Sequence, residues 1–323
     1  MTKRAVGVDL GGTFIKAGVV DDHGRILSRV KIDTQYARGP DMVVARIALA
    51  ASKAVERAKL TWPRIGAVGL GSPGIFEPGS GVVSMSPNMP ELAGLDLAGL
   101  VRERIGRKHI NVFLDNDANL AAFAEYWVGS GGDTRDLVLF TLGTGIGGGI
   151  VLNGDIWRGA WGVAGEFGHM NLFPDGVRCG CGNHGCLEAY ASAPALARRF
   201  KEAVGAGRPS SLAPLLARGA AVSARDISRA AGDGDRTCRE LIEETGRFLG
   251  IGVMNMLHIL NVERVIFAGG MTAAGELLLE PIRAEARRRT LPLALRNVEI
   301  VFSKLGNDAG LIGAGGWAMR AAK

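Results

Sequence analysis

The sequence has no stretch of about 20 consecutive apolar residues, the length that a helix needs to cross a bilayer. Its most apolar segment, residues 248–260, is interrupted by two glycines, an asparagine and a histidine. Near the N-terminus, the apolar run after the basic residues 1–4 meets Asp9 and two glycines, too early for the hydrophobic part of a secretion signal. We therefore expect a cytoplasmic protein with no membrane partner.

The sequence also has almost no clusters of basic residues, although its formal net charge is +6 and its pI is near 9.3. Only Arg287, Arg288 and Arg289 form a run. This run lies in an expected helix without interleaved aromatic residues, so a solvated helix face explains it better than a nucleic-acid surface. We expect no nucleic-acid partner.

Low-complexity linkers are absent as well. The 323 residues exceed the size at which one core usually keeps growing, and 47% of them are hydrophobic. This combination predicts a globular protein of two lobes with a cleft between them.

A glycine-turned hairpin near the N-terminus returns later in the chain. Apolar runs at 6–10 and 15–20 flank the first turn, and runs at 138–142 and 150–152 flank the second. A repeat of this length predicts two similar α/β lobes rather than a solenoid, whose units are far shorter. The periodicity around the hairpins predicts a loop at 71–90, strands at 26–32, 65–70, 111–114, 264–267 and 298–302, and helices at 42–58, at 97–106, from Leu120, within 194–260 and from 309 onward.

The two hairpin turns read Asp9-Leu10-Gly11-Gly12-Thr13 and Leu142-Gly143-Thr144-Gly145. Glycine lets backbone N–H groups approach phosphate oxygens closely, and the threonine hydroxyls add donors. One such turn is more often a plain hairpin turn, but two at matching positions favour a shared polyphosphate site. Asp9 ends a buried strand beside this site, which favours positioning of Mg²⁺ through water; ordering of the turn is the alternative.

Two other phosphate-binding motifs are excluded. Gly143, Gly145 and Gly148 have the spacing of the dinucleotide fingerprint, but that motif opens a helix, whereas a second strand follows here. No Gly-Lys-Ser/Thr sequence occurs, so there is no P-loop.

The segment Asp115-Asn116-Asp117-Ala118-Asn119 stands between an expected strand and an expected helix. Capping of the helix explains any one of these residues equally well, but two carboxylates and two amides exceed what one cap requires. Phosphoryl transfer needs a carboxylate that accepts the proton of the attacking hydroxyl. We choose Asp117 for that role and interpret Asp115 as structural.

Three of the four cysteines, Cys179, Cys181 and Cys186, fall within eight residues among glycines. In a cytosolic protein this density favours metal over disulfides, and three thiolates with one histidine complete a closed tetrahedral zinc site. The spacing alone admits either His169 or His184. The fourth cysteine, Cys238, is expected to be a small buried apolar residue.

These motifs resemble those of the ROK sugar kinases, within the actin, hexokinase and Hsp70 ATPase superfamily. The most specific match is Gly165-Glu166-Phe167-Gly168-His169 followed by Cys179-Gly-Cys181-Gly-Asn-His-Gly-Cys186-Leu-Glu188. The resemblance runs from Val6 to about Gly316. It implies the actin-like ATPase (ribonuclease H-like) α/β fold, two lobes around a central cleft: residues 1–118 with a closing helix at 306–323, and residues 119–305 with a zinc loop at 165–188.

The resemblance also implies a role for each motif. Asp117 would be the catalytic base, and His169 would complete the structural zinc site with the three cysteines. ATP and Mg²⁺ would be held by Asp9, Gly11, Gly12, Thr13, Lys16, Gly143, Thr144, Gly145, Gly269 and Gly270. The sugar would be held by Asn88, Asn116, Asp117, Glu166, His169 and Glu188, where each glutamate alone would otherwise be interpreted as a surface residue.

The implied activity is ATP-dependent phosphorylation of a hexose at O6, with D-glucose favoured and a homodimer or homotetramer expected. Other sugars of the family remain open, namely fructose, mannose, allose, N-acetylglucosamine and N-acetylmannosamine, as does polyphosphate as donor. A single pocket contact separates epimers by only ~1 to 3 kcal/mol. A sugar-responsive repressor is the alternative from another class, but ROK repressors carry an N-terminal helix-turn-helix, for which we expect no room before Val6.

Overall fold

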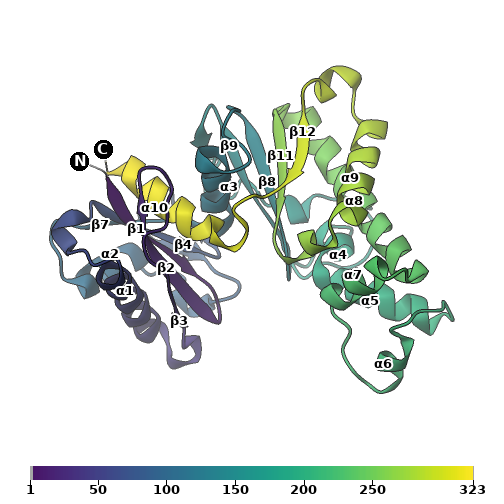
Figure 1. Cartoon of the computed structure of the whole chain (residues 1–323), viewed down its shortest axis with the longest axis horizontal. Helices are drawn as coiled ribbons and strands as arrows, with labels where there is room; N and C mark the ends of the chain where they lie inside the picture. The colour runs from purple at the N-terminus through teal and green to yellow at the C-terminus, as the bar shows by residue number, and fades with distance from the viewer. Residues whose placement is uncertain (1–2, 323) are drawn as a thin grey trace. The chain divides into compact units, whose positions relative to one another are not determined.

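The computed structural model describes residues 3–322, and Figure 1 shows the chain coloured from its N- to its C-terminus. By internal packing it divides into two compact units. The lobe boundaries expected from the sequence stay a prediction. The first unit comprises Met1–Arg135, Gly149–Gly165 and Lys304–Lys323, and the second comprises Asp136–Gly148 and Glu166–Ser303.

A five-stranded mixed sheet forms the centre of the first unit, in the order β3-β2-β1-β4-β7. The first three strands pair antiparallel, whereas β1, β4 and β7 are parallel. Every residue of β4 is buried, as its apolar and glycine-rich sequence predicts for a central parallel strand. The strands are β1 (Arg4–Leu10), β2 (Phe14–Asp21), β3 (Val30–Asp33), β4 (Ala67–Ser72) and β7 (Asn111–Asn116).

The second five-stranded sheet has the corresponding order, β10-β9-β8-β11-β12. The hairpin β8-β9 takes the place of β1-β2, and β11 and β12 follow as parallel strands. The repeat expected from the two glycine turns is therefore confirmed at the level of topology. The strands are β8 (Leu137–Leu142), β9 (Ile146–Leu152), β10 (Asp155–Ile156), β11 (Arg264–Ala268) and β12 (Glu299–Phe302).

Helix α10 (Ala309–Ala321) packs directly on the first sheet because glycine removes side chains at the contact (Figure 1). A Cβ atom at Gly7 would overlap the carbonyl of Leu311, and one at Gly69 would overlap that of Ala314. Gly7 and Gly69 are partners in the β1-β4 register. The C-terminal helix is thereby held close to β1, which contains Asp9 and ends at Leu10, and to β4, which ends at Ser72.

Helices dominate the second unit. Helix α8 (Arg236–Leu260) lies against α9 (Glu276–Arg289), and two glycines one turn apart make the contact close. A Cβ atom at Gly246 would lie 2.7 Å from the Cβ atom of Pro281, and one at Gly250 would lie 2.7 Å from the Cβ atom of Glu285. Both substitutions would force the helices apart.

The bounds differ from the expected pattern at β3, which begins at Val30 rather than residue 26, at β9, which begins at Ile146 rather than residue 150, in the loop at 71–90, where a short antiparallel pair occurs, and at α3, which begins at Asp117 rather than Leu120. No helix within residues 3–322 is both long and apolar enough to cross a membrane. The other helices and strands are α1 (Pro40–Arg57), α2 (Leu97–Ile105), α3 (Asp117–Val128), α4 (Glu188–Ala191), α5 (Ala193–Gly205), α6 (Ala213–Ala217), α7 (Ala224–Gly232), β5 (Ile75–Phe76) and β6 (Val83–Met85). The 3-10 helices are η1 (Tyr36–Arg38), η2 (Trp62–Arg64), η3 (Pro90–Leu92), η4 (Phe167–His169), η5 (Gly270–Ala274), η6 (Pro292–Leu295) and η7 (Gly306–Asp308).

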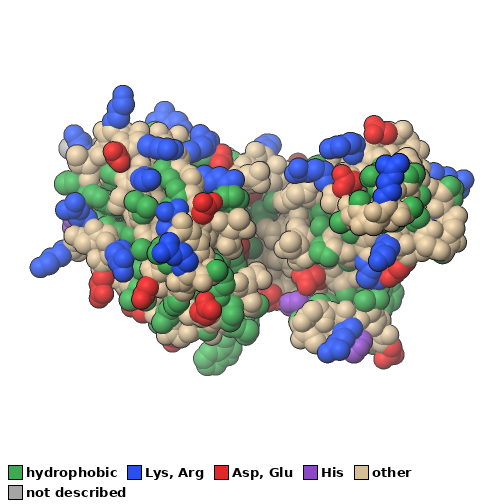
Figure 2. Space-filling view, turned by 90° about the horizontal axis from the view of Figure 1, so that it is seen from below, with side chains coloured by type: hydrophobic (Ala, Val, Ile, Leu, Met, Phe, Trp, Pro, Cys, Tyr) green, Lys and Arg blue, Asp and Glu red, His purple; other side chains and the backbone are tan. Residues whose placement is uncertain are grey.

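The basic run at the end of α9 forms ion pairs within its own helix. Arg288 Nη2 lies 2.8 Å from Glu285 Oε1, and Arg289 contacts the same carboxylate. Their hydrogen bonds, that of Arg288 first, hold the pKa of Glu285 below its usual value. On the face shown in Figure 2, Lys and Arg side chains likewise lie among Asp and Glu side chains.

Candidate functional site

The first glycine turn joins β1 to β2 and is fastened to β3. Gly11 N–H donates to the carbonyl of Phe14 at 3.0 Å, and the buried Thr34 donates its hydroxyl to the carbonyl of Gly11 at 2.6 Å. The amide of Thr34 donates to the carbonyl of Thr13 at 2.9 Å. Gly12 and Thr13 remain exposed at the tip, so their groups are accessible to an anion.

Asp9 and Lys16 face each other across this hairpin. They are register partners in β1 and β2, and Lys16 Nζ lies 3.3 Å from Asp9 Oδ2. Lys16 Nζ also donates to the carbonyl of Asn307 at 3.2 Å. A Cβ atom at Gly310, in the first turn of α10, would lie 3.2 Å from Asp9 Cγ. The carboxylate thus lies between an ammonium group and a helix N-terminus, both of which stabilise its negative charge.

The second glycine turn, in the second unit, is held from both sides by the segment that follows the cysteines. Ala193 N–H donates to the carbonyl of Gly143 at 3.0 Å, and Ile146 N–H donates to Glu188 Oε2 at 2.8 Å. A Cβ atom at Gly145 would overlap the Glu188 carboxylate. The turn therefore depends on glycine at 145 and on a carboxylate at 188.

Gly269 and Gly270 lie beside the same turn. Gly269 has φ of +99°, and a Cβ atom there would overlap the carbonyl of Leu142. The pair follows β11, and Gly269 N-caps the short 3-10 helix η5. The structure thus brings Gly269, one of the glycines predicted to bind ATP, against the second turn.

Asn116 caps α3. Its Oδ1 accepts hydrogen bonds from the amides of Ala118 at 2.8 Å and Asn119 at 3.2 Å, and its Nδ2 donates to the carbonyl of Gly74 at 3.0 Å. The capping interpretation therefore holds for Asn116. One N–H of its side-chain amide is left for a ligand.

Asp117 is the first residue of α3, with its Oδ1 accepting a hydrogen bond from the amide of Ala118 at 2.9 Å. The partial positive charge of a helix N-terminus favours a carboxylate at this place. Asn88, predicted to contact a sugar, lies exposed in another loop of the same unit. That loop is tied to the one after β4, since Ser86 donates its hydroxyl to the carbonyl of Pro73 at 3.1 Å.

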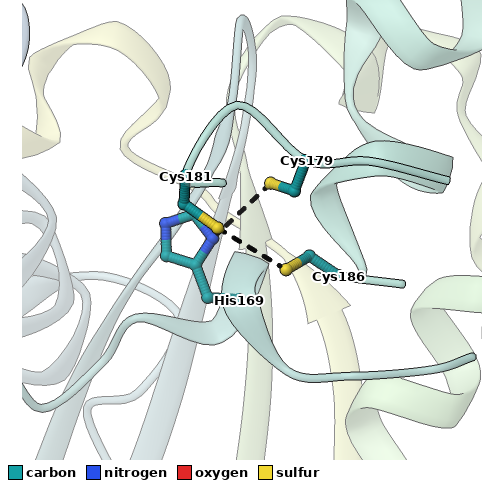
Figure 3. Close-up of side chains that lie close together, drawn as sticks. All are labelled: His169, Cys179, Cys181 and Cys186. Atoms are coloured by element: carbon teal, nitrogen blue, oxygen red, sulfur yellow. Dashed lines mark hydrogen bonds between the residues drawn. The ribbon is translucent and has the colours of Figure 1, made fainter. Parts of the chain in front are cut away.

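The predicted metal ligands lie together (Figure 3). One donor atom from each of the four side chains lies within 4.8 Å of the others. Cys181 Sγ is 3.7 Å from Cys186 Sγ, and Cys179 Sγ is 3.9 Å from His169 Nδ1. Zinc–sulfur bonds of about 2.3 Å in a tetrahedron place sulfurs roughly 3.8 Å apart, so these residues fit a zinc ion. The four residues of this Cys₃His cluster are His169, Cys179, Cys181 and Cys186.

The thiols of the cluster have unequal surroundings. Burial raises the pKa of Cys179, and burial together with the neighbouring thiols raises the pKa of Cys186 to about 12. The hydrogen bond from the backbone of Asn183 lowers the pKa of Cys181. Binding of a metal therefore requires loss of protons from buried thiols, as is general for thiolate sites.

Two glutamates flank the cluster. Glu166 Oε2 lies 3.9 Å from His169 Nε2, the ring nitrogen that does not face Cys179. Glu188 Oε1 lies 3.8 Å from Cys179 Sγ, while its other oxygen binds the second glycine turn. The cluster, both carboxylates and that turn therefore form one connected group within the second unit.

Comparison with known proteins identifies the family. The sequence matches the model of the ROK family over residues 5–321. The chain belongs to the ROK family. It is 36% identical to a glucokinase from Halalkalibacterium halodurans over 98% of this chain and 94% of that one. It is 33% identical to a xylose repressor from Caldicellulosiruptor bescii, over 95% of this chain and 76% of the repressor.

Among solved structures, a ROK family glucokinase from Streptomyces griseus, in complex with glucose and AMPPNP, matches with a TM-score of 0.83. The two chains are 37% identical, and the match covers 98% of this chain and 99% of that one. This likeness confirms the actin-like α/β fold expected from the resemblance.

Within this ROK chain, the predicted site residues fall into one set per unit. The histidine whose ring lies beside the three cysteines is His169. His184 instead contributes its backbone carbonyl, which accepts from Asn171 Nδ2 at 2.7 Å. The first unit holds Asp9, Gly11, Gly12, Thr13, Lys16, Asn88, Asn116 and Asp117, and the second holds Gly143, Thr144, Gly145, Glu166, Glu188, Gly269, Gly270 and the Cys₃His cluster.

Sequence reasoning missed the residues that support these sets. Thr34 holds the first turn, Ala193 holds the second, and Arg158 binds Asp115. None of the three belongs to a glycine, cysteine or acidic motif, and Arg158 is 43 positions from its partner. The hydrogen bonds that reveal these residues depend on tertiary structure.

Proposed function

We propose that this ROK protein is an ATP-dependent glucokinase, which transfers the γ-phosphoryl group of ATP to O6 of D-glucose. The observation that carries the proposal is the carboxylate of Asp117, fixed at the start of α3, in a chain that has a glycine turn in each of its two corresponding hairpins, β1-β2 and β8-β9. The family membership and the glucokinase from H. halodurans support the same activity. The S. griseus glucokinase, which binds glucose and the ATP analogue AMPPNP, supports the substrate pair.

Phosphoryl transfer needs fixed geometry and neutralised charge more than covalent chemistry. In the proposed mechanism Asp117 accepts the proton of the O6 hydroxyl as this oxygen attacks the γ-phosphorus, and the bond to the β-phosphate oxygen breaks. In each glycine turn the backbone amides would be donors to phosphate oxygens, and Thr13 would add a hydroxyl donor in the first turn and Thr144 in the second. Mg²⁺, when bound, neutralises phosphate charge, and Asp9 would hold it, with Lys16 beside this carboxylate.

The residues proposed to bind sugar hydroxyls are Asn88, Asn116, Asp117, Glu166, His169 and Glu188. A zinc ion held by the Cys₃His cluster would fix His169 so that Nε2 remains a donor, and Glu166 lies 3.9 Å from this nitrogen. The proposed role of zinc is structural, because all four ligands come from protein.

The test is a product assay with Mg-ATP and a panel of hexoses and N-acetylhexosamines. We expect glucose 6-phosphate as the main product, and a fall in kcat of about 10³-fold or more for Asp117→Asn. Asp41→Asn is the matched control, because Asp41 is an exposed carboxylate in the first turn of α1. Full turnover by Asp117→Asn would reject the base assignment, and a different preferred sugar would reject glucose.

The second candidate is a sugar-responsive repressor without turnover, and the 33% identity to a xylose repressor favours it. Sugar binding in calorimetry with no phosphorylated product in the same assay would establish this alternative. We also propose a homodimer or homotetramer in the cytoplasm. Light scattering during size-exclusion chromatography measures that assembly.

A further inference from the structure

Arg158 forms a largely buried ion pair with Asp115, two residues before the proposed catalytic base. It follows β10, and its Nε and Nη2 atoms lie 2.8 and 2.5 Å from Asp115 Oδ2. The side chains of Arg158 and Asp115 are 22% and 6% exposed. The guanidinium also lies over the ring of Trp317 in α10, 4.5 Å from its centroid. The arginine is therefore held by a carboxylate at its edge and an aromatic ring against its face.

The second oxygen of Asp115 organises the start of α3. Asp115 Oδ1 accepts hydrogen bonds from the amide of Asn116 at 2.8 Å and from Asn119 Nδ2 at 3.1 Å. One carboxylate thus joins the end of β7 to the first turn of α3. Asp117 lies in the chain between these two donors.

We infer that Arg158 is a positioning residue for Asp117, acting through Asp115, an inference that rests on the proposed kinase function. Without Arg158, Asp115 would be a buried carboxylate without its cation, which must take up a proton or turn toward water. Either change weakens the bonds from Asn116 and Asn119 that fix the junction. A displacement of about 1 Å at a reacting group costs on the order of 100-fold in rate.

A cavity at this position makes the inference testable by chemical rescue. The cavity has a volume of about 560 Å³ and is lined by Asp115, Arg158, Trp317 and Arg102 among others. In Arg158→Ala, free guanidinium can enter from the cavity and occupy the place between the carboxylate and the indole ring. A small planar cation restores the interaction without any change in the chain.

The experiment measures kcat and KM for glucose and ATP in Arg158→Ala, Arg158→Lys and Arg102→Ala. We expect kcat to fall by about 100-fold in Arg158→Ala. KM for ATP should change by no more than about threefold, because none of the predicted ATP-binding residues lies in this junction, whereas KM for glucose should rise, because Asn116 and Asp117 are also proposed to hold the sugar. Guanidinium at non-denaturing concentration should recover most of the lost kcat, whereas sodium chloride at equal ionic strength should not.

The controls separate positioning from general stabilisation. Arg158→Lys keeps the charge but cannot form the two-pronged contact, so its kcat should lie between those of the wild type and Arg158→Ala. Arg102 is an exposed lining residue outside the site, so Arg102→Ala should behave as the wild type. Guanidinium should not rescue Asp117→Asn. Unchanged kcat in Arg158→Ala, or equal recovery with sodium chloride, overturns the inference.

Hydrogen–deuterium exchange gives a readout that needs no turnover. The amides of Asn116, Ala118 and Asn119 should exchange at least about tenfold faster in Arg158→Ala than in the wild type, and guanidinium should slow them again. If Arg158→Ala does not fold, Arg158→Lys is measured in the same way. An inactive wild type would reject the kinase proposal, whereas unchanged exchange in these amides would reject the inference about Arg158.

Discussion

At the scale of single residues, the glycines of the two turns serve different needs. A Cβ atom at Gly12 or Gly143 would have no neighbour within 4 Å, so these positions keep space open for a ligand. Gly145 is different, because the space beside it is filled by the Glu188 carboxylate that binds the amide of Ile146. A glycine whose missing side chain makes room for another side chain of the protein affects the stability of the fold as well as ligand binding.

We predict that Gly145→Ala destabilises the protein by ~1 to 3 kcal/mol, the usual cost of overpacking. The methyl group would displace Glu188 and break its hydrogen bond to Ile146. Chemical denaturation measures the loss, and KM for ATP should rise as the turn loosens. Gly143→Ala is the matched control for stability and should leave the midpoint of unfolding unchanged; equal midpoints for the two variants would contradict the role given to Glu188.

At the scale of elements, helix starts depend on single polar side chains. Asp235 caps α8, the longest helix of residues 3–322, and accepts hydrogen bonds from the amides of Cys238 and Ser211 and the hydroxyls of Ser210 and Ser211. Burial tends to raise the pKa of Asp235, but these hydrogen bonds outweigh it and hold the pKa well below its usual value. The ionised carboxylate is thus the form that stabilises the fold.

We predict that Asp235→Ala lowers the free energy of unfolding by ~1 to 2 kcal/mol at pH 7, as loss of a helix cap does. Because the folded pKa is depressed, the contribution is fully present above the unfolded pKa of about 3.9 and is lost as pH falls below it. The free energies of unfolding of the wild type and of Asp235→Ala should therefore become equal at acid pH. Asp233→Ala removes an exposed carboxylate two positions earlier and should have little effect at any pH.

Tertiary hydrogen bonds explain why the observed bounds of an element differ from those that the sequence pattern predicts. A strand was expected at 26–32, but β3 begins at Val30. Ser28 interrupts it, because its hydroxyl accepts the amide of Val19 at 3.2 Å and donates to the carbonyl of Ala54 in α1 at 2.7 Å. Such a bond to a distant helix leaves no periodic pattern in the sequence. The inner strands of both sheets, which follow continuous apolar runs, begin within about four residues of the expected positions.

At the scale of the whole chain, the repeat of the glycine hairpin predicted two similar α/β lobes, and the structure shows two five-stranded sheets with corresponding strand orders. The proximity of the predicted residues could be expected where they are close in sequence, as in the cysteine loop and at Asn116 and Asp117. It was not predictable where a contact joins separate segments, as between Glu188 and Ile146 or between Arg158 and Asp115. The spacing of residues in the sequence predicts only contacts between residues that are close together in the chain.

The Cys₃His cluster is connected to the second glycine turn, because the segment that follows the cysteines binds this turn through Glu188 and Ala193. We predict one zinc ion per chain by elemental analysis, and a lower unfolding temperature after chelation, since a structural metal contributes its binding energy to folding. Cys186→Ser should lose the metal, whereas Cys238→Ala, which removes the buried thiol outside the cluster, should retain it. Faster amide exchange at residues 143–146 after chelation would link the metal to the turn; unchanged exchange there, with the metal gone, would show that the turn is held without it.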